Sequence, residues 1–544
     1  MMSRWQRMIA LSPVLITIAS ISIGIVQPQS VNAEANPASH SVIASENQIT
    51  AEGILQRGEM KYNQGDLRGA IEDYNQAIRL KPNYAIAYYS RGVVRSELGD
   101  YKGAIEDYNQ AIKLKPDFAE AYTNRGADRR ELGDYKGAIE DYSQAIKLRP
   151  NLAIAYYNRG RAHSRLGDYK GAVEDYSQAI KLKPNYATYS NRGLDRSRLG
   201  DYKGAIEDYN QAIKLKADYA TVYYNRGNAR SDLGDKKGAI EDFNQAIKLK
   251  PDYTDAYISR GIVRSDLGDK KGAIEDYNQA IKLKPDYTNA YYGRGIVRSD
   301  LGDKKGAIDD YNQAIKLKPD YANAYNNRGI VRSGLGDNKG AIEDYNQAIK
   351  LKPDDADAYS NRGNARSELG DKKGAIDDYN QAIKLKPNYA DAYYNRGLAR
   401  VELGDKKGAI DDYNQAIKLK PDYANTYIGR GIVRSDLGDK KGAIDDYNQA
   451  IKLKPDDAIP YYNRGIVRSE LGDKKGAIED YNQAIKLKPD YVEAYYNRGL
   501  AHRRSGNTQK AIEDYQKAAD LYKDQGEIGD YQDALNQVKK LSYK

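Results

Sequence analysis

The chain has 544 residues, with 86 lysines and arginines against 77 aspartates and glutamates, so its formal net charge is +9. This positive balance is modest for such a length. The chain contains no cysteine, which excludes disulfide bonds and thiolate metal sites.

The first 33 residues have the pattern of a targeting segment. Arg4 and Arg7 supply a positive start, and Met8–Val26 is a largely apolar run. Small residues ending at Ala33 form a cleavage site, so we expect a signal peptide that is removed after Ala33. The alternative is an uncleaved membrane anchor, because the run 8–26 is just long enough to span a bilayer. Either outcome predicts an exported protein that is periplasmic, lumenal or secreted.

Residues 34–50 are polar and lack apolar periodicity, so we expect a flexible lead-in. From about residue 51 the chain repeats a unit of thirty-four residues, best seen in Ala390–Tyr423. The first half of this unit contains no proline and places Tyr393 and Gly397 one helical turn apart. It is therefore predicted to be a helix.

The second half of the unit predicts another helix. Ala409, Tyr413 and Ala416 recur at spacings of three and four, which is the apolar stripe of an amphipathic helix. Asp405 can cap its free amides, and Pro421 ends it because proline has no amide hydrogen. Each unit is therefore expected to be two helices joined by a turn.

This unit resembles the tetratricopeptide repeat (TPR) family. The period matches, and so do the signature positions Tyr393, Gly397, Leu403, Gly404, Ala409, Tyr413, Ala416 and Pro421. Aligned on the glycine, residues 51–525 contain fourteen copies. The resemblance implies an all-α fold, namely an α-solenoid in which the repeats stack as a superhelix.

One feature departs from the family pattern. The position before the aligned glycine, which is usually leucine in the family, is arginine in every copy, and the position four residues later is arginine in most. Each copy also carries an aspartate beside the tyrosine of the second helix. Because an unpaired buried charge is costly, we predict a structural ion pair between the two helices, such as Arg396 with Asp412.

Glycines in the first turn of the second helix, such as Gly408, are a second departure, because each one destabilises a helix relative to alanine. They indicate either a compliant array or close packing between neighbouring units.

Spacing is irregular at one place. Gly160 and Gly193 are thirty-three residues apart, and the missing residue lies within residues 185–189. This predicts a local change of superhelical pitch near residues 185–220. After the last copy, residues 526–544 are expected to form a capping helix, because their apolar residues share one face. That face comprises Tyr531, Ala534, Leu535, Val538 and Leu541.

Sequence motifs of catalysis are missing. The chain has no glycine-rich phosphate loop, no histidine pair at metal spacing and no nucleophile elbow, and its three histidines are far apart. We therefore expect no enzyme activity, no cofactor and no bound metal.

The family resemblance implies that the first helices line a concave groove that binds peptide segments of partner proteins. Asparagine recurs two residues before the aligned glycine, and a carboxamide can both donate to and accept from a peptide backbone. The alternative is a tolerated polar residue multiplied by duplication. The predicted groove asparagines are Asn124, Asn158, Asn191, Asn225, Asn327, Asn361, Asn395, Asn463 and Asn497.

Charge along this groove changes in the third to fifth copies. Arg130, Arg161, Arg165 and Arg198 make that stretch basic, whereas most later copies carry an acid at the position of Glu402. We predict that these four arginines bind an acidic partner.

A different class of function uses the other face. Lysines crowd the second helices, as in Lys407 and Lys418, and would form a basic convex surface. The alternative prediction is therefore an envelope-associated structural protein that binds polyanions. Nucleic acid is not favoured, because the tyrosines fall on packing and groove positions instead of this face. The sequence does not predict an oligomeric state.

Overall fold

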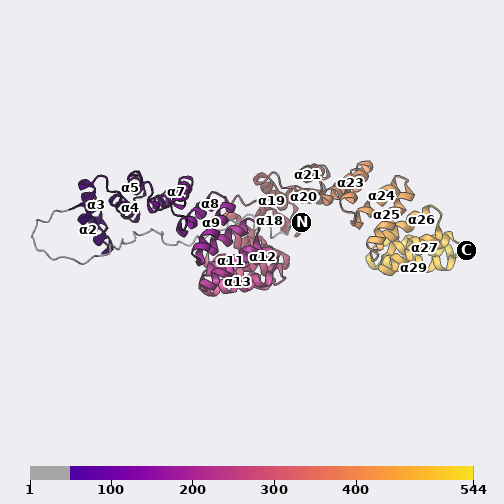
Figure 1. Cartoon of the computed structure of the whole chain (residues 1–544). Helices are drawn as coiled ribbons and strands as arrows, with labels where there is room; N and C mark the ends of the chain where they lie inside the picture. The colour runs from indigo at the N-terminus through magenta and orange to yellow at the C-terminus, as the bar shows by residue number, and fades with distance from the viewer. Residues whose placement is uncertain (1–49, 543–544) are drawn as a thin grey trace, which may run out of the picture. The chain divides into compact units, whose positions relative to one another are not determined.

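The computed structural model describes residues 50–542. The predicted signal segment and nearly all of the lead-in lie outside this range. Within it the regular secondary structure consists of 29 helices, α2 to α30, without any strand (Figure 1). This confirms the expected all-α fold. No helix between residues 50 and 542 is long and apolar enough to cross a membrane.

The described part of the chain divides into two compact units, the first ending at Pro285 and the second beginning at Asp286. In each unit consecutive helices pair, and the pairs pack in tandem as an α-solenoid. The first unit contains α2 (Ala51–Asn63), α3 (Leu67–Leu80), α4 (Ala85–Glu97), α5 (Tyr101–Leu114), α6 (Ala119–Glu131), α7 (Tyr135–Leu148), α8 (Ala153–Arg165), α9 (Tyr169–Leu182), α10 (Tyr186–Arg198), α11 (Tyr202–Leu215), α12 (Ala220–Leu233), α13 (Lys236–Leu249), α14 (Thr254–Asp266) and α15 (Lys270–Leu283).

The second unit has the same organisation and ends with one unpaired helix. It contains α16 (Thr288–Asp300), α17 (Lys304–Leu317), α18 (Ala322–Ser333), α19 (Asn338–Leu351), α20 (Ala356–Glu368), α21 (Lys372–Leu385), α22 (Ala390–Glu402), α23 (Lys406–Leu419), α24 (Ala424–Asp436), α25 (Lys440–Leu453), α26 (Ala458–Glu470), α27 (Lys474–Leu487), α28 (Val492–Arg504), α29 (Thr508–Gln525) and α30 (Ile528–Ser542).

Local signals explain the helix boundaries. Gly404 has a φ of +83°, which turns the chain between α22 and α23. The side chain of Asp405 then caps α23 by accepting a hydrogen bond from the amide of Gly408 at 2.9 Å. A Cβ on Gly408 would lie 2.1 Å from Oδ2 of Asp405. A side chain at position 408 would displace this capping carboxylate, which gives the glycine a reason within its own helix. The compliance of the array stays a prediction.

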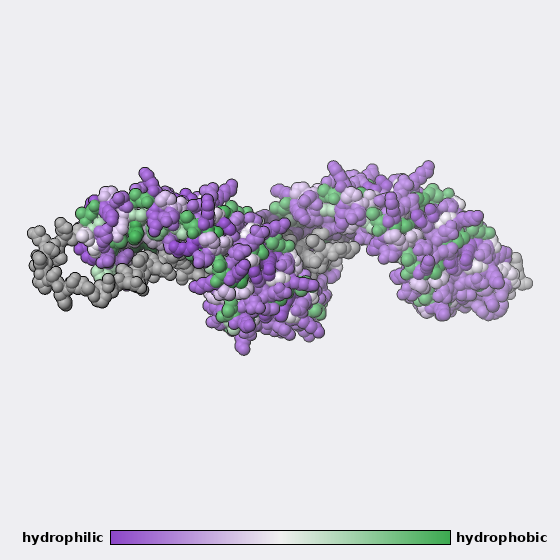
Figure 2. All heavy atoms as spheres, viewed as in Figure 1, coloured by the Kyte–Doolittle hydropathy of each residue, from purple (hydrophilic) through white to green (hydrophobic). Residues whose placement is uncertain are grey.

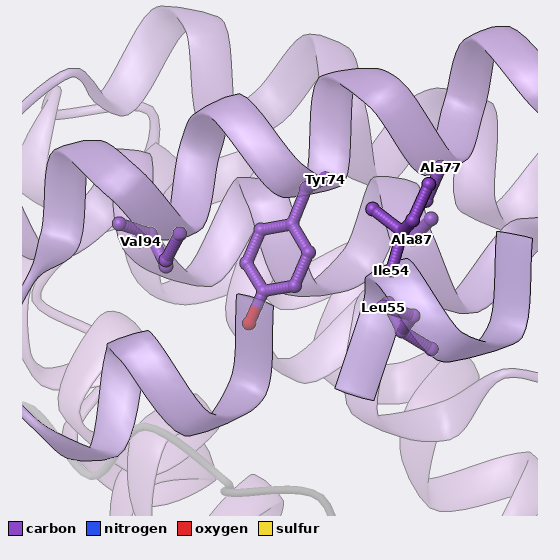
Figure 3. Packing of buried hydrophobic residues seen from close by; sticks show 7 residues of the cluster. Ile54, Leu55, Tyr74, Ala77, Ala87 and Val94 are labelled. Carbon is purple, nitrogen blue, oxygen red and sulfur yellow. The ribbon is translucent and has the colours of Figure 1, made fainter. Parts of the chain in front are cut away.

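The core is built mainly from small residues and rings. Figure 3 shows Tyr74 of α3 beside Ala77, with Ile54 of α2 and Ala87 and Val94 of α4 in the same buried cluster. This cluster joins one repeat to the next, so the core continues along the solenoid within the unit.

The ring of the second helix also presses on the first helix of its own repeat. A Cβ on Gly397 would lie only 2.7 Å from Cε1 of Tyr413. Glycine is required at this position because the ring occupies the space of a side chain.

The predicted ion pair is confirmed. Nη2 of Arg396 lies 2.5 Å from Oδ1 of Asp412, and Nη1 of Arg400 lies 2.9 Å from its Oδ2. The carboxylate of Asp412 is buried, so two guanidinium groups compensate one charge that water does not reach. Both arginine positions therefore face the second helix, as expected.

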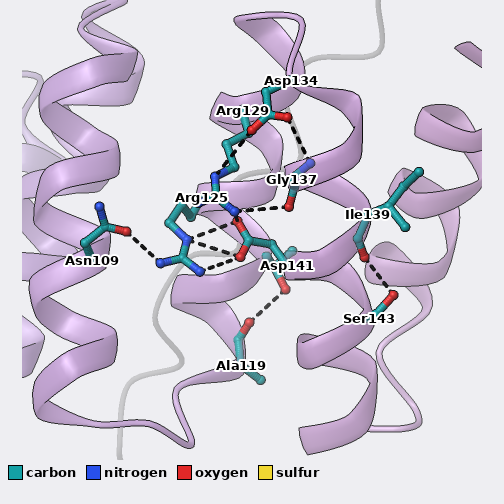
Figure 4. Close-up of polar contacts among 10 residues, drawn as sticks. Asn109, Ala119, Arg125, Arg129, Asp134, Gly137, Ile139, Asp141 and Ser143 are labelled. Atoms are coloured by element: carbon teal, nitrogen blue, oxygen red, sulfur yellow. Dashed lines mark hydrogen bonds and ion pairs between the residues drawn. The ribbon is translucent and has the colours of Figure 1, made fainter. Parts of the chain in front are cut away.

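The arginines also join neighbouring repeats, which was not predicted. In Figure 4, Arg125 of α6 contacts Asp141 of α7 in its own repeat. Its Nη1 donates to Oδ1 of Asn109 in the preceding repeat at 2.6 Å. The same link recurs along the chain, for example from Arg396 to Asn380 at 2.6 Å. An arginine with this link stabilises both its own helix pair and the stack, whereas Arg57 of the first copy bonds only within its own repeat.

The missing residue is removed from the turn between α9 and α10. Asn185 caps α10 there by accepting from the amide of Thr188 at 2.9 Å, whereas α8 begins without a side-chain cap. Helix α10 keeps the 13 residues of α8. The change of superhelical pitch stays a prediction.

Helix α30 lies against α29, which has 18 residues where the other second helices have 14. Ala534 of α30 is buried, and Tyr531 and Leu535 pack on Ala519 and Tyr522 of α29. The apolar face of α30 therefore covers the final repeat.

Candidate functional site

Within each unit, the first helices of the repeats, which carry even numbers, form a continuous face. Successive first helices pack against each other, as α6 does with α8 and α8 with α10. The second helices are held mainly by the first helices on either side of them. Each unit therefore curves with its first helices inside, and we call the exposed side of the even-numbered helices the inner face.

Most predicted groove asparagines link neighbouring repeats. Nδ2 of Asn124 donates to Oη of Tyr89 at 3.1 Å, and Asn327 donates likewise to Tyr292 at 2.9 Å. Asn191 and Asn497 repeat this bond with Tyr157 and Tyr462. Two further asparagines donate to an asparagine of the preceding repeat: Asn361 to Asn326 and Asn395 to Asn364. Asn158 accepts a hydrogen bond from Arg130. Asn225 and Asn463 are half-buried.

The tyrosines that accept these bonds follow a pattern of two repeats, which was not predicted. The position three before the aligned glycine alternates between tyrosine and a smaller residue over copies two to nine, as in Tyr89, Thr123, Tyr157, Ser190, Tyr224, Ile258, Tyr292 and Asn326. The ring of Tyr292 lies 6.0 Å from that of Tyr311 and 4.8 Å from that of Tyr321. Over copies two to nine, a repeat with a tyrosine at this position is therefore followed by a repeat with a smaller residue. The size of the side chain at this position thus alternates with a period of two repeats.

Two of the four predicted basic residues are used inside the scaffold. Arg130 is buried and donates to Asn158 at 3.1 Å and to Glu131 at 2.7 Å. Arg198 donates to Ser164 at 3.1 Å and to Asp195 at 2.8 Å. Their charges are balanced by acids on the same helices, Glu131 and Asp195, and uncharged groups of neighbouring repeats accept further hydrogen bonds.

The other two, Arg161 and Arg165, lie on α8 and differ from this pair. The guanidinium of Arg161 is 5.8 Å from the ring centre of Tyr157, and Arg165 is exposed. In the described part of the chain, neither lies within ion-pair distance of a carboxylate. Burial raises the pKa of Tyr157, and the positive charge of Arg161 opposes that rise.

Acids at the end of the first helices are paired in later repeats. Lys236 lies 3.0 Å from Asp266 in the next repeat, and Lys372 lies 2.7 Å from Glu402. In the third and fourth copies the lysine position holds Tyr135 and Tyr169. The basic stretch thus coincides with the loss of an ion pair between repeats.

Two buried carboxyl groups were missed. Asp128 and Asp195, each 1% exposed, accept hydrogen bonds from Ser96 at 2.6 Å and Ser164 at 3.0 Å, while Oδ2 of each has no hydrogen-bond partner among the described residues. Burial raises the pKa of Asp128 to about 7 and also raises that of Asp195. The signal was available, because this position is apolar in every other copy.

Among residues 50–542, no group of acidic and histidine side chains is arranged to hold a metal ion. Hydrophilic residues cover most of the surface visible in Figure 2, and hydrophobic residues are scattered between them.

Solved structures that the chain resembles have low overall similarity. MamA is 29% identical over 32% of this chain and 94% of its own, with a TM-score of 0.29. Yeast Tom70 is 17% identical over 91% of this chain and 96% of its own, with a TM-score of 0.33. YrrB, a TPR protein with an unusual peptide-binding site, is 22% identical over 34% of this chain and 96% of its own, with a TM-score of 0.32. These scores carry no argument about function, and no curated protein matches the chain.

Family models match along most of the repeats. The model of the "TPR repeat" matches residues 58–99, 94–127, 128–167, 196–234, 263–302, 300–336, 332–370, 364–404, 433–472 and 469–506. The model of the "Tetratricopeptide repeat" matches residues 153–186, 220–253, 390–423 and 492–525. Proteins with these repeats are generally non-catalytic scaffolds for protein interaction. The chain belongs to the tetratricopeptide repeat family.

Proposed function

We propose that the inner face binds extended peptide segments of partner proteins. The observation that carries this proposal is the direct packing of successive first helices, because it joins their exposed side chains into one surface that spans several repeats. A long continuous surface suits an extended segment, which presents side chains and backbone groups along its whole length.

The second unit supplies apolar contacts for such a segment. Leu398 of α22 and Ile432 of α24 are each 40% exposed and occupy the same position in adjacent repeats. Asn395 lies beside Leu398 and has a second amide hydrogen and a carbonyl oxygen besides the bond that it donates to Asn364. Apolar contact together with a carboxamide can hold a peptide whose side chains vary.

The test uses two positions in one repeat. A photo-crosslinking amino acid replaces Leu398 on the inner face in one protein, and exposed Lys418 on α23 in another. Each protein is incubated with extracytoplasmic extract and washed at low and high salt before the crosslinked partner is identified. We expect a defined protein to be crosslinked at position 398, and to remain after the high-salt wash. Crosslinks at position 418 alone would contradict the proposal.

The second candidate is polyanion binding by the lysines of the second helices. Exposed residues such as Lys407 and Lys418 support it, although acids such as Asp411 lie on the same helix. Because polyanion binding releases counterions, it weakens steeply as salt rises. Crosslinks at position 418 to anionic polymers, lost at high salt, would favour this function.

Export is part of the proposal and is tested separately. The charged and apolar pattern of residues 1–33 supports it. N-terminal sequencing of the protein from the extracytoplasmic fraction should begin at Glu34, whereas an uncleaved anchor would keep Met1 or Met2 and fractionate with membranes.

A further inference from the structure

We propose that the part of the inner face on α8 binds an acidic segment of a partner protein through Arg161 and Arg165. This inference rests on the proposed peptide-binding function and names the chemistry of one class of partner. It narrows the basic stretch from four arginines to two, because Arg130 and Arg198 are already engaged within the scaffold.

The two arginines lie on the same side of α8, four residues apart. Like charges at this spacing repel each other, so an anion between them would relieve the repulsion. Helix α8 contains no aspartate or glutamate that could do so.

Acids of the neighbouring helices and turn are bound to other groups, and Asp195 of α10 accepts from Ser164 and Arg198. Glu131 accepts from Arg130, and Asp175 lies 2.7 Å from Arg159. Asp168 lies 2.8 Å from Nδ1 of His163. The two charges are thus left for a group that comes from outside the chain.

The corresponding positions of other repeats show what has changed. At the position of Arg165, later repeats place an acid such as Asp266 that pairs with the lysine of the preceding repeat. The preceding repeat here offers Tyr135, which carries no charge to balance an arginine. At the position of Arg161, the only charged residue in another repeat is Glu59 of the first copy.

Arg161 is also partly ordered before binding. Its guanidinium lies over the ring of Tyr157, and Oη of Tyr157 accepts a hydrogen bond from Asn191 at 3.2 Å. Ordering the side chain in advance reduces the entropy that binding would remove. Guanidinium groups bind carboxylates through two parallel hydrogen bonds, so acidic side chains are the group that these arginines fit.

The test measures binding of a fluorescent oligoglutamate peptide to the full chain by anisotropy. One variant carries Arg161→Gln and Arg165→Gln. The matched control carries Lys147→Gln and Lys181→Gln, which removes two exposed charges from the second helices α7 and α9. We expect the first variant to bind at least about tenfold more weakly, since each lost bond to a charged group is worth that much or more. The control should bind within about twofold of the unchanged chain.

Three results would overturn the inference: no binding by the unchanged chain, equal weakening in both variants, or equal affinity in all three proteins. Heparin serves as a second probe, and weakening of heparin binding by the control alone would assign polyanions to the second helices. The outcome of the crosslinking experiment at position 398 does not depend on any of these binding results. The peptide-binding function and this inference can therefore fail separately.

Discussion

Ser96 of α4 donates a hydrogen bond to Oδ1 of Asp128 on α6 across the contact between two first helices. The other carboxyl oxygen of Asp128 is buried without a hydrogen-bond partner among the described residues. An ionised carboxylate in this position is poorly compensated, and the neighbouring charges are Glu131 and Arg130 on its own helix.

The first prediction concerns the pH dependence of stability. Burial raises the pKa of Asp128 from 3.8 to about 7, so between these values the folded chain binds a proton that the unfolded chain has released. The free energy of unfolding should therefore fall as the pH rises through this window, by up to about 4 kcal/mol. Hydrogen exchange of amides in α4 to α7 should speed up as the pH rises, beyond the intrinsic rate.

Asp128→Asn should weaken this pH dependence and slow exchange above the pKa, because the amide carries no charge. Part of the dependence should remain, because burial also raises the pKa of Asp141 on α7. Asp117→Asn, at an exposed position in the same unit, is the control and should leave the dependence unchanged. A flat profile in the unchanged chain would contradict the prediction.

The second prediction concerns the ion pair between helices. Arg396→Leu leaves the buried carboxylate of Asp412 with Arg400 alone, so unfolding should cost about 3 kcal/mol less. Adding Asp412→Leu removes the uncompensated charge and should recover part of the loss. Urea unfolding of the unchanged chain, of each single variant and of the double variant measures the coupling. An unchanged midpoint for Arg396→Leu would show that the pair is not needed.

The third prediction concerns the close approach of α22 and α23. Gly397→Ala places a methyl group against the ring of Tyr413 and should lower the unfolding free energy by about 1–3 kcal/mol. Gly334→Ala is the matched control, because its nearest neighbour would be 3.4 Å from the new Cβ. Thermal unfolding should shift for the first variant only; equal shifts would rule out the steric explanation.

The fourth prediction separates the two roles of the asparagines. Asn327→Ala removes the bond to Tyr292 and should cost about 0.5–1.5 kcal/mol of stability. Asn463→Ala, at the same position in a repeat where no such bond is formed, should be nearly neutral. If both variants were equally stable but bound a partner more weakly, the asparagines would act in recognition and not as links.

Most of the fold could be predicted because the signals are local and repeated. The stripe of Ala409, Tyr413 and Ala416 and the stop at Pro421 specify a helix from neighbouring residues alone. The Arg396–Asp412 pair could also be predicted, since a carboxylate buried between two helices needs an opposite charge on one of them.

The candidate site could be predicted only in part. Asn124 and Arg130 lie on α6, which is a first helix, but both are buried and bonded to the preceding or the next repeat. Asp128 was not predicted as a special residue, because the repeat was read as an average over many copies. At this position nearly all copies have an apolar residue.

The sequence by itself determined the helices, their order and the family, because each depends on spacings within thirty-four residues. Only the tertiary structure decided which charges remain available. Arg130 and Arg161 look alike in sequence, but Arg130 meets Asn158 of the next repeat and Glu131, whereas Arg161 meets a ring and no carboxylate. Whether an arginine is engaged depends both on acids of its own helix and on groups that the stacking of repeats brings within a few ångströms.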